Sequence, residues 1–440
     1  METERLDSLP PRVDVAVVGG GICGCVCAAE LARRGARVLV LEKEAELGEE
    51  ASGRSFGGLR LQGRHPAELP LARAALDLWA KAARTLPPPD IEFVQGGNLY
   101  VAEQESELEE LRVTRDGAHA AGFSDVRLLT ADETREIVPD LTGEFAGALY
   151  SPRDGHCDPK RAVLAYAAQA RQHGALVALR TKAVDLLVSD GAVAGIVTDR
   201  GQVRADRVVV AAGVWTPHLL KRLGFRIPLK RIVYTCAETS PLPPLFRPTI
   251  RGFSFSVRQR PNGQLVLGCG LNATVESPLS LDDLVDLRLW LPRYLAHRRQ
   301  IVLRLDVGSV WGDVRATARG RPATDRVPVA VHPPGNAAAV EGAFAALRRR
   351  MPRARDVDMT RTWAGFIDLS PDGLPVIERA ARPRGLVFLT GLSGHGLCLA
   401  PVFGQILADL ATGGETAYDL SPFRLGRLHA PRVPMPPRLI

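Results

Sequence analysis

Three glycines near the amino terminus have the spacing needed to bind a phosphate. The segment from Val13 to Glu42 reads VDVAVVGGGICGCVCAAELARRGARVLVLE, and Gly19, Gly21 and Gly24 form a G-x-G-x-x-G pattern directly after a β-branched run. Gly19 permits a sharp turn, Gly21 lets the backbone approach a pyrophosphate, and Gly24 lets the next helix pack on the strand. The free N–H groups at the start of that helix can then bind an anion.

Glu42 limits which dinucleotide this turn can accept. It ends the second apolar run, at a position where a carboxylate accepts hydrogen bonds from a ribose 2′-hydroxyl. A phosphate on that hydroxyl would be repelled by the carboxylate. The pattern therefore predicts FAD or NAD and excludes NADP, and it places the adjoining residues Ile22 and Lys43 in the same site.

The elements that position this turn alternate between buried strands and helices. A strand, a turn, a helix and a second strand in this order are typical of a parallel sheet covered by helices. Elsewhere the chain changes to short strands, a hairpin at Pro261-Asn262-Gly263 and separate helices at 280–299 and 336–350. The sequence predicts an α/β fold with a discontinuous Rossmann-type domain formed by 1–90, 151–225 and 361–440, and a second α+β domain on a mixed or antiparallel sheet formed by 91–150 and 226–360.

Two glycine-rich loops could complete the site. Residues 48–64 (GEEASGRSFGGLRLQGR) offer hydroxyl and guanidinium donors to a second phosphate or a flavin ring, although an exposed flexible loop has the same composition. The loop at 391–396 (GLSGHG) precedes a helix whose amino end favours negative charge, such as that of a reduced flavin. An alternative interpretation of this second loop is a linker with an incidental histidine.

Composition excludes several other classes of protein. The 440 residues carry a formal charge of +7, but the arginines are spread along the chain between acids, so no nucleic-acid-binding face is indicated. The longest apolar runs are strand-length and the amino terminus is charged, so we expect no membrane span and a cytoplasmic protein. Cys23, Cys25 and Cys27 point to different sides of one helix, and no metal site is predicted.

The chain resembles the D-amino-acid-oxidase superfamily of flavoproteins, nearest to the branch of the sarcosine oxidase β-subunit, glycine oxidase and amino-acid deaminase. The resemblance covers nearly the whole length and rests on VAVVGGGICG, ASGRSFGGLR, AAGVWTPHLL, WAGFIDLSPDGLPVIE and GLSGHGLCLAPVFGQILADL. It implies that the Rossmann-type domain binds FAD and that the second domain is the substrate domain, with its sheet over the flavin. It also implies oxidation of a C–N bond alpha to a carboxylate, in an amino acid or N-substituted amino acid of the sarcosine, glycine or D-amino-acid type. We expect hydride transfer to flavin N5 followed by hydrolysis of the imine.

The resemblance also assigns individual residues to the cofactor. His395 falls at the pyrimidine edge of the flavin and is a catalytic candidate as well. The other implied contacts are Gly19, Gly21, Ile22, Gly24, Glu42, Lys43, Ser52, Arg54, Ser55, Gly58, Leu59, Val184, Ala212, Gly213, Trp215, Gly391, Gly394, Gly396 and Leu397.

Departures from the family pattern shape the expected chemistry. Gly365 stands where some members attach flavin to a cysteine, and the loop at 48–60 has no histidine, so FAD should be bound non-covalently. Val266 and Cys398 stand where some oxidases have lysines. Without a cation over the flavin, we expect slow reaction with oxygen and a preference for another acceptor or a partner protein.

The substrate carboxylate needs an arginine, and the sequence leaves its identity open. Ile367-Asp368 replaces the Arg-Pro of glycine oxidase, which leaves Arg60 and Arg258 as candidates, although either could be an ordinary surface arginine. Asp368 could receive a cationic amine, or it could cap the turn before Ser370.

Two alternatives to a self-sufficient amine or amino-acid oxidase remain open. The chain could be the FAD-carrying subunit of a heteromeric amine dehydrogenase, or an NAD(P)H-driven flavin monooxygenase. The second alternative needs a further nicotinamide-binding pattern, which is absent from the sequence between 150 and 360.

Overall fold

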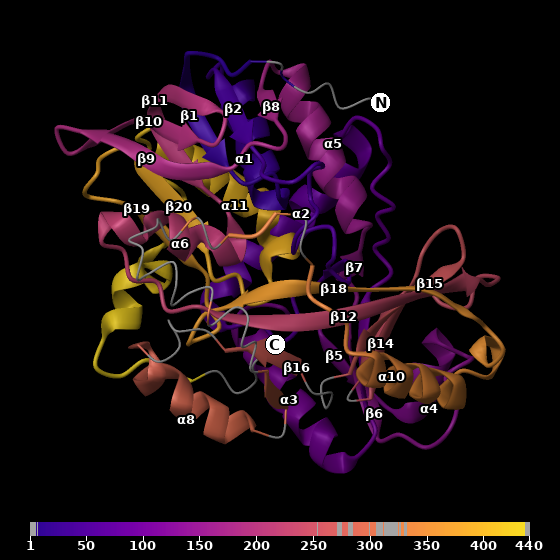
Figure 1. Cartoon of the computed structure of the whole chain (residues 1–440). Helices are drawn as coiled ribbons and strands as arrows, with labels where there is room; N and C mark the ends of the chain where they lie inside the picture. Colours follow the sequence, from indigo (N-terminus) through magenta and orange to yellow (C-terminus); the bar gives the residue numbers. More distant parts are fainter. Residues whose placement is uncertain are drawn as a thin grey trace.

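The computed structural model contains two large β-sheets, one above the other in Figure 1, and a short two-stranded sheet, and helices pack against both large sheets. It describes residues 6, 8–252, 254–270, 275–279, 285–298, 300–304, 311, 324, 327–329 and 332–435. In this part of the chain, no helix is long and apolar enough to cross a membrane.

The first sheet is built around the strand that precedes the glycine turn. β1 (Arg12–Val18) pairs in parallel with β2 (Val38–Leu41) on one side and with β11 (Gly201–Val210) on the other. β8 (Leu176–Ala178) extends the sheet beyond β2, and β20 (Leu386–Thr390) extends it beyond β11. Every residue of β2 and β20 is buried, as expected for strands covered on both faces.

Helices from distant parts of the sequence pack on one face of this sheet. α1 (Ile22–Arg33) follows the glycine turn and packs against α5 (Pro159–Gln172) and α11 (Gly396–Ala411), and α11 also packs against α2 (Leu69–Thr85) (Figure 1). β9 (Ala183–Ser189) and β10 (Ala192–Thr198) form an antiparallel pair beside this sheet, β10 also pairs with β11, and β19 (Val376–Arg379) adds an antiparallel edge. These elements form the predicted α/β, Rossmann-type layer.

The second sheet is mixed, also as predicted. Its longest strand is β12 (Lys230–Pro241), and the predicted hairpin is formed by β14 (Phe255–Gln259) and β15 (Gln264–Cys269). The pairs β13·β4 and β16·β17 are parallel and the others are antiparallel. The remaining strands are β4 (Asn98–Ala102), β5 (Arg127–Leu129), β6 (Gly147–Ser151), β13 (Thr249–Gly252), β16 (Val275–Pro278), β17 (Ile301–Arg304) and β18 (Met359–Leu369).

Helices cover the outer face of the second sheet. α10 (Ala337–Arg350) contributes Val340, Phe344 and Leu347 to a core with the hairpin strands. α4 (Ala131–Ile137) packs on the same core, whereas α3 (Glu105–Ala120) packs on the opposite face of β4 and β6, through Leu108 and Leu111, in the core of the first layer. α8 (Leu287–His297) packs separately, against Ile232 and Leu369. The helix predicted at 336–350 is confirmed, whereas residues 280–284 and 299 of the one predicted at 280–299 lie outside the described residues.

Strand β18 crosses the boundary that the sequence suggested at residue 361. Over most of its length it pairs with β12, from the Thr239–Met359 pair to the Lys230–Leu369 pair. The second sheet therefore extends to Leu369, and the chain returns to the first sheet at β19. The division into two folding domains stays a prediction.

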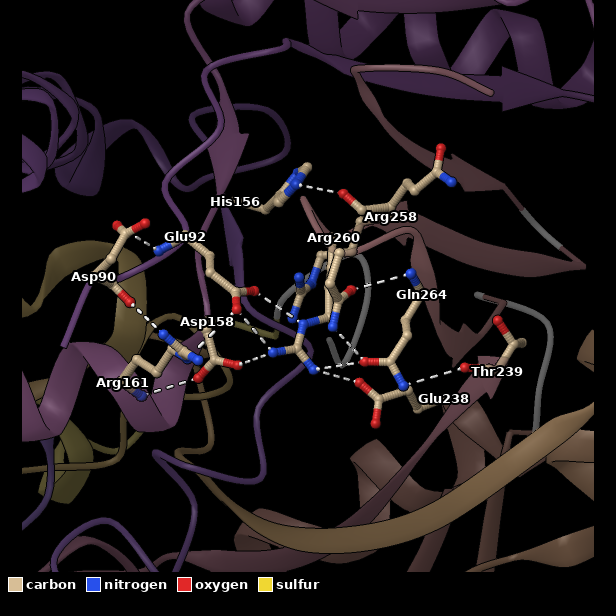
Figure 2. A network of polar contacts seen from close by, with 12 residues as sticks. Asp90, Glu92, His156, Asp158, Arg161, Glu238, Thr239, Arg258, Arg260 and Gln264 are labelled. Carbon is tan, nitrogen blue, oxygen red and sulfur yellow. Dashed lines mark hydrogen bonds and ion pairs between the residues drawn. The ribbon is translucent and has the colours of Figure 1, made fainter. Parts of the chain in front are cut away.

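One arginine joins the two layers through several carboxylates. Arg260, directly after β14, lies 2.9 Å from Glu92, 3.1 Å from Asp158 and 2.5 Å from Glu238 (Figure 2). Asp158 also accepts a hydrogen bond from the Arg161 amide at the start of α5, and Glu238 lies on β12. The guanidinium thus ties the end of the hairpin both to its own sheet and to a helix of the first layer.

Further contacts hold β14 beside the loop at 48–64. The His156 ring nitrogens lie 3.1 Å from the Gln259 carbonyl and 3.1 Å from the Thr249 hydroxyl, and Arg258 Nε donates to the Phe56 carbonyl at 2.5 Å. Burial lowers the pKa of His156 to about 3, with Arg258 adding to the effect, so the ring is neutral. These contacts therefore hold β13 and β14 of the second sheet in place beside the loop at 48–64.

Replacing Arg260 by methionine should destabilise the fold strongly. The variant would leave Glu92, Asp158 and Glu238 close together without their shared cation, and breaking a buried ion pair from one side typically costs about 3–5 kcal/mol. Urea unfolding of Arg260→Met measures the loss. Arg12→Met is the control, because the Arg12–Asp206 pair is exposed. Equal losses of unfolding free energy in the two variants would contradict the stabilising role of Arg260.

Candidate active site

A cavity of about 270 Å³ lies between the two sheets. At one end it is bordered by the carboxyl ends of β1, β2 and β11, and at the other by residues of β12, β13 and β14. Ligands of open parallel sheets bind at this edge, where the strand order reverses. The cavity therefore joins the predicted dinucleotide turn to the second sheet.

The glycines of the turn have the predicted separate tasks. Gly19 has φ of +112°, and a Cβ there would lie 2.4 Å from the Ala211 carbonyl oxygen. A Cβ on Gly24 would lie 2.0 Å from the Gly19 carbonyl oxygen, so Gly24 serves packing and is not on the cavity wall. Gly21 lines the cavity, where a side chain would meet Ser52 Oγ and project into the space of a ligand.

Two polar side chains brace the turn from within. Ser52 Oγ accepts a hydrogen bond from the Ile22 amide at 3.0 Å, at the first residue of α1. The Glu42 carboxylate accepts hydrogen bonds from the Gly20 amide at 2.7 Å and the Glu44 amide at 2.9 Å. Burial raises the pKa of Glu42 although these amides oppose the shift. Glu42 also lines the cavity, and its contact with a ribose stays a prediction.

Most of the predicted cofactor residues line this one cavity. Lys43 does so while paired with Glu44 and Glu50, and the Trp215 ring lies 5.8 Å from its Nζ. The predicted residues on the wall are Gly19, Gly21, Ile22, Glu42, Lys43, Ser52, Arg54, Ser55, Gly58, Ala212, Gly213, Trp215, Gly394, Gly396 and Leu397.

Besides Gly24 and His395, three predicted cofactor residues lie away from the wall: Leu59, Val184 and Gly391. Leu59 is fully buried in the hydrophobic core between the sheet and its helices. The Val184 carbonyl accepts a hydrogen bond from the Thr324 hydroxyl, and Thr181, Lys182 and Ala183 line the cavity in its place. Gly391 packs against Leu229 and Ser370 with φ of +67°, so it shapes the loop instead of contacting a ligand.

The last glycine-rich loop brings a second helix terminus to the cavity. Gly396 and Leu397 begin α11 and line the wall, so this helix directs its amino end at the ligand space, as the sequence predicted. The His395 side chain does not line the cavity. Its ring contacts the buried Glu68 carboxylate at 2.9 Å and lies 3.5 Å from Arg60 Nη2. Direct contact of His395 with a cofactor or substrate is therefore not supported.

Of the two predicted substrate arginines, only Arg60 reaches the cavity. Arg258 is 2% exposed and lies beneath Gly57, where its Nε donates to the Phe56 carbonyl. Sequence reasoning missed Arg251, which lines the cavity from β13. Within the described residues, the Arg251 side chain has no hydrogen bond or ion pair.

Arg251 and Arg60 make this end of the cavity positive. Burial lowers the pKa of Arg60 to about 9, and the positive charges of Arg251 and Arg64 add to the shift, so Arg60 still carries its charge at neutral pH. Thr249, Tyr234 and Ser256 complete the polar wall from the second sheet. An anionic group that entered here would meet two guanidinium groups.

Asp368 lies near the end of β18, where it contacts the loop that follows β20 of the first sheet. It lines the cavity with 5% exposure, and its Oδ2 has no hydrogen-bond partner among the described residues. Burial raises its pKa to about 6, against hydrogen bonds from the Leu392 and Gly391 amides. The alternative role of capping the next turn belongs to Asp372, which accepts a hydrogen bond from the Leu374 amide.

The two positions used to predict the electron acceptor do not line the cavity. Val266 is buried on β15 opposite Arg258, and the Cys398 thiol contacts the Arg60 carbonyl. Arg60 and Arg251 bring positive charge to the wall, so valine and cysteine at these two positions do not leave the site without a cation. Slow reaction with oxygen stays an untested prediction.

The cavity fits a dinucleotide with a redox-active ring. Its wall includes the turn at Gly21, which has no side chain, and the amino ends of α1 and α11. Asp368 Oδ2, which has no partner among the described residues, could accept a hydrogen bond from a hydroxyl group of the ligand. The second sheet closes the other end with a polar wall. This combination defines a dinucleotide-dependent oxidoreductase.

Comparison with known proteins identifies the family. The model of the FAD dependent oxidoreductase (DAO) family matches residues 14–410, and the chain belongs to this family. Glycine oxidase of Geobacillus kaustophilus is 27% identical over 426 residues, which cover 94% of this chain and 97% of that protein. Hydrogen cyanide synthase subunit HcnC of Pseudomonas aeruginosa is 23% identical, and the matched region covers 94% of this chain and 96% of that protein.

A solved structure shows the same fold over nearly the whole chain. L-amino acid deaminase from Proteus myxofaciens, in complex with anthranilate, superposes with a TM-score of 0.86 and 21% identity, covering 97% of this chain and 96% of that one. The family assignment makes FAD the cofactor and confirms the predicted amine or amino-acid oxidoreductase class.

Gly21→Val should remove FAD and leave the chain folded. The valine side chain would enter the ligand space beside Ser52, and overpacking of this kind typically costs about 1–3 kcal/mol, so we expect roughly tenfold less flavin per chain. Flavin absorbance and circular dichroism measure the two properties. Gly117→Val is the control, since a Cβ on Gly117 meets nothing within 4 Å. Full flavin content in Gly21→Val would contradict the assignment.

Proposed function

We propose that this protein oxidises the C–N bond of an amino acid or N-substituted amino acid whose carboxylate is bound by Arg251 and Arg60. The observation that carries the proposal is the Arg251 side chain, which lines the cofactor cavity and has no partner within the described residues. A guanidinium group in this state is suited to form charge-assisted hydrogen bonds with a carboxylate.

The chain's own groups would orient the substrate more than react with it. Arg251 and Arg60 would hold the carboxylate, and Tyr234, whose hydroxyl donates to the Cys269 carbonyl at 3.3 Å, would form the adjacent wall. FAD, when bound, supplies the hydride acceptor. The substrate loses a hydride from carbon and a proton from nitrogen, and water then converts the imine to an oxo acid and an amine or ammonia.

In this arrangement, Asp368 would form a hydrogen bond with the cofactor. Its carboxylate is held by the loop at 390–392, close to Cys23 at the start of α1, and not beside the two arginines. We therefore assign it to a hydroxyl of the FAD chain instead of a substrate amine.

Arg251→Met should separate substrates that have a carboxylate from those that lack one. Loss of a hydrogen bond to a charged group costs about 1.5–3 kcal/mol, so anthranilate should bind roughly 10- to 100-fold more weakly, whereas its neutral isostere anthranilamide should be unaffected. Perturbation of the flavin absorbance reports both dissociation constants. Anaerobic bleaching by a panel of amino acids and simple amines tests the reaction itself.

The exposed variant Arg12→Met is the matched control for these measurements. Unchanged binding of anthranilate to Arg251→Met, or bleaching by amines that lack a carboxylate as fast as by amino acids, would contradict the proposal.

FAD is proposed to be bound without a covalent bond. Gly365 lines the cavity, and a Cβ there would lie 2.8 Å from Arg54 Cβ, so a cysteine does not fit at this position without movement. Acid precipitation should release all of the FAD into the supernatant. Yellow colour that remains in the protein pellet would show that the flavin is attached to the chain.

A second candidate function is that of an FAD-carrying subunit. It is favoured by the likeness to hydrogen cyanide synthase subunit HcnC, whose name marks it as part of a larger assembly. Size-exclusion chromatography of the protein from its native cells distinguishes the two. A larger complex, together with bleaching that requires the partner, would replace the self-sufficient enzyme.

A further inference from the structure

A buried charged cluster lies directly behind the wall of the cavity. Glu68, in the short turn Pro66–Glu68 before α2, is 0% exposed. Its carboxylate lies 2.9 Å from His395 Nδ1 and 3.7 Å from Arg64 Nη1. Neither Glu68 nor Arg64 lines the cavity or has a part in the proposed chemistry. A fully buried carboxylate is costly to maintain, so its contacts require an explanation.

The two neighbours of His395 determine its tautomer. Arg60 Nη2, 3.5 Å from Nε2, can only donate a hydrogen bond, so Nε2 must present its lone pair. The proton then lies on Nδ1, where the Glu68 carboxylate accepts it. Burial lowers the pKa of His395, and Arg64 and Arg60 oppose its protonation although Glu68 favours it, which agrees with a neutral ring.

These contacts leave part of Arg60 free for a ligand. Nη1 donates to the Gln62 carbonyl and Nη2 faces His395, which uses two of the five N–H donors of the guanidinium. The Arg60 carbonyl accepts a hydrogen bond from Arg64 Nε at 2.7 Å. Arg60 is therefore held through both its backbone and its side chain while it lines the cavity.

We propose that Glu68 is a positioning residue for substrate recognition: it fixes the Nδ1–H tautomer of His395, whose Nε2 then holds the Arg60 guanidinium in place for a carboxylate. This inference rests on the proposed function in assigning a carboxylate to Arg60. The orientation of His395 by Glu68 is a separate statement about the fold, and it can be tested without any substrate.

The first test addresses the tautomer alone. In the holoenzyme labelled with ¹⁵N-histidine, the ring signals that disappear in His395→Gln belong to His395, and we expect the pattern of a neutral ring protonated at Nδ1. Glu68→Leu should lose this pattern. A ring protonated at Nε2, or a pattern that Glu68→Leu does not change, would overturn the inference.

The second test uses anthranilate and anthranilamide as probes of the holoenzyme. Glu68→Gln removes the charge that orients His395 and keeps the side-chain shape, so anthranilate should bind roughly tenfold more weakly, as expected when about 1.4 kcal/mol of a charge-assisted contact is lost, while anthranilamide should bind as before. Glu105→Gln, exposed on α3, is the matched control for the loss of one charge. Flavin content monitors folding in each variant.

The outcomes separate this inference from the proposed function. If Arg251→Met weakens anthranilate and Glu68→Gln does not, the role of Glu68 is wrong and the proposed function stands. If Glu68→Gln weakens both probes equally, Glu68 is merely structural and the inference fails. If neither Arg251→Met nor Arg60→Met discriminates the two probes, the carboxylate site itself is wrong and both proposals fail. Should Glu68→Gln not fold, the ring signals of the wild type still decide the tautomer.

Discussion

The close approach of three backbone segments at the end of β1 is the constraint on which the structure depends. Gly19 lies against the Ala211 carbonyl and Gly24 lies against the Gly19 carbonyl, each at a distance that excludes a side chain. Because β1 and β11 pair in parallel up to Val18 and Val210, their following turns must meet at the same edge of the sheet. This contact opens the wall of the cavity to a pyrophosphate and directs α1 at it.

Charge shielded from water is the second organising feature, and it is paired at one place and left without an ion pair at another. Between the two layers, Arg260 neutralises carboxylates from three separate segments. At the wall itself, Arg251 and Arg60 are left without a carboxylate of their own within the described residues. A guanidinium group that is partly shielded from water and has no ion pair is costly, so an anionic ligand would be stabilised at this place. Under the proposed function, the same electrostatic cost would govern both the stability of the fold and the binding of the substrate carboxylate.

The sequence was a good guide wherever function depends on local backbone geometry. The glycine turn, Glu42 at the end of β2, the second helix terminus at Gly396 and the mixed second sheet follow from short-range patterns, and the structure has them. The proposed substrate arginine, Arg251, could not be found in this way. Arg251 and Arg258 both lie on strands of the same sheet, and the strand pattern does not show that the Phe56–Gly57 backbone covers Arg258 and leaves Arg251 on the wall.

The surroundings of His395 and Asp368 could not be predicted for the same reason. His395 lies in a glycine-rich loop that reaches the cavity, yet its ring contacts Glu68, a residue more than 300 positions earlier in the chain. Asp368 depends on the loop at 390–392 for its environment. The sequence by itself determined the dinucleotide turn, the family and the FAD cofactor, because these rest on residue types at fixed short spacing. Only the tertiary structure decided which charged side chains face the ligand, because burial and charge pairing arise between segments that are distant in the sequence.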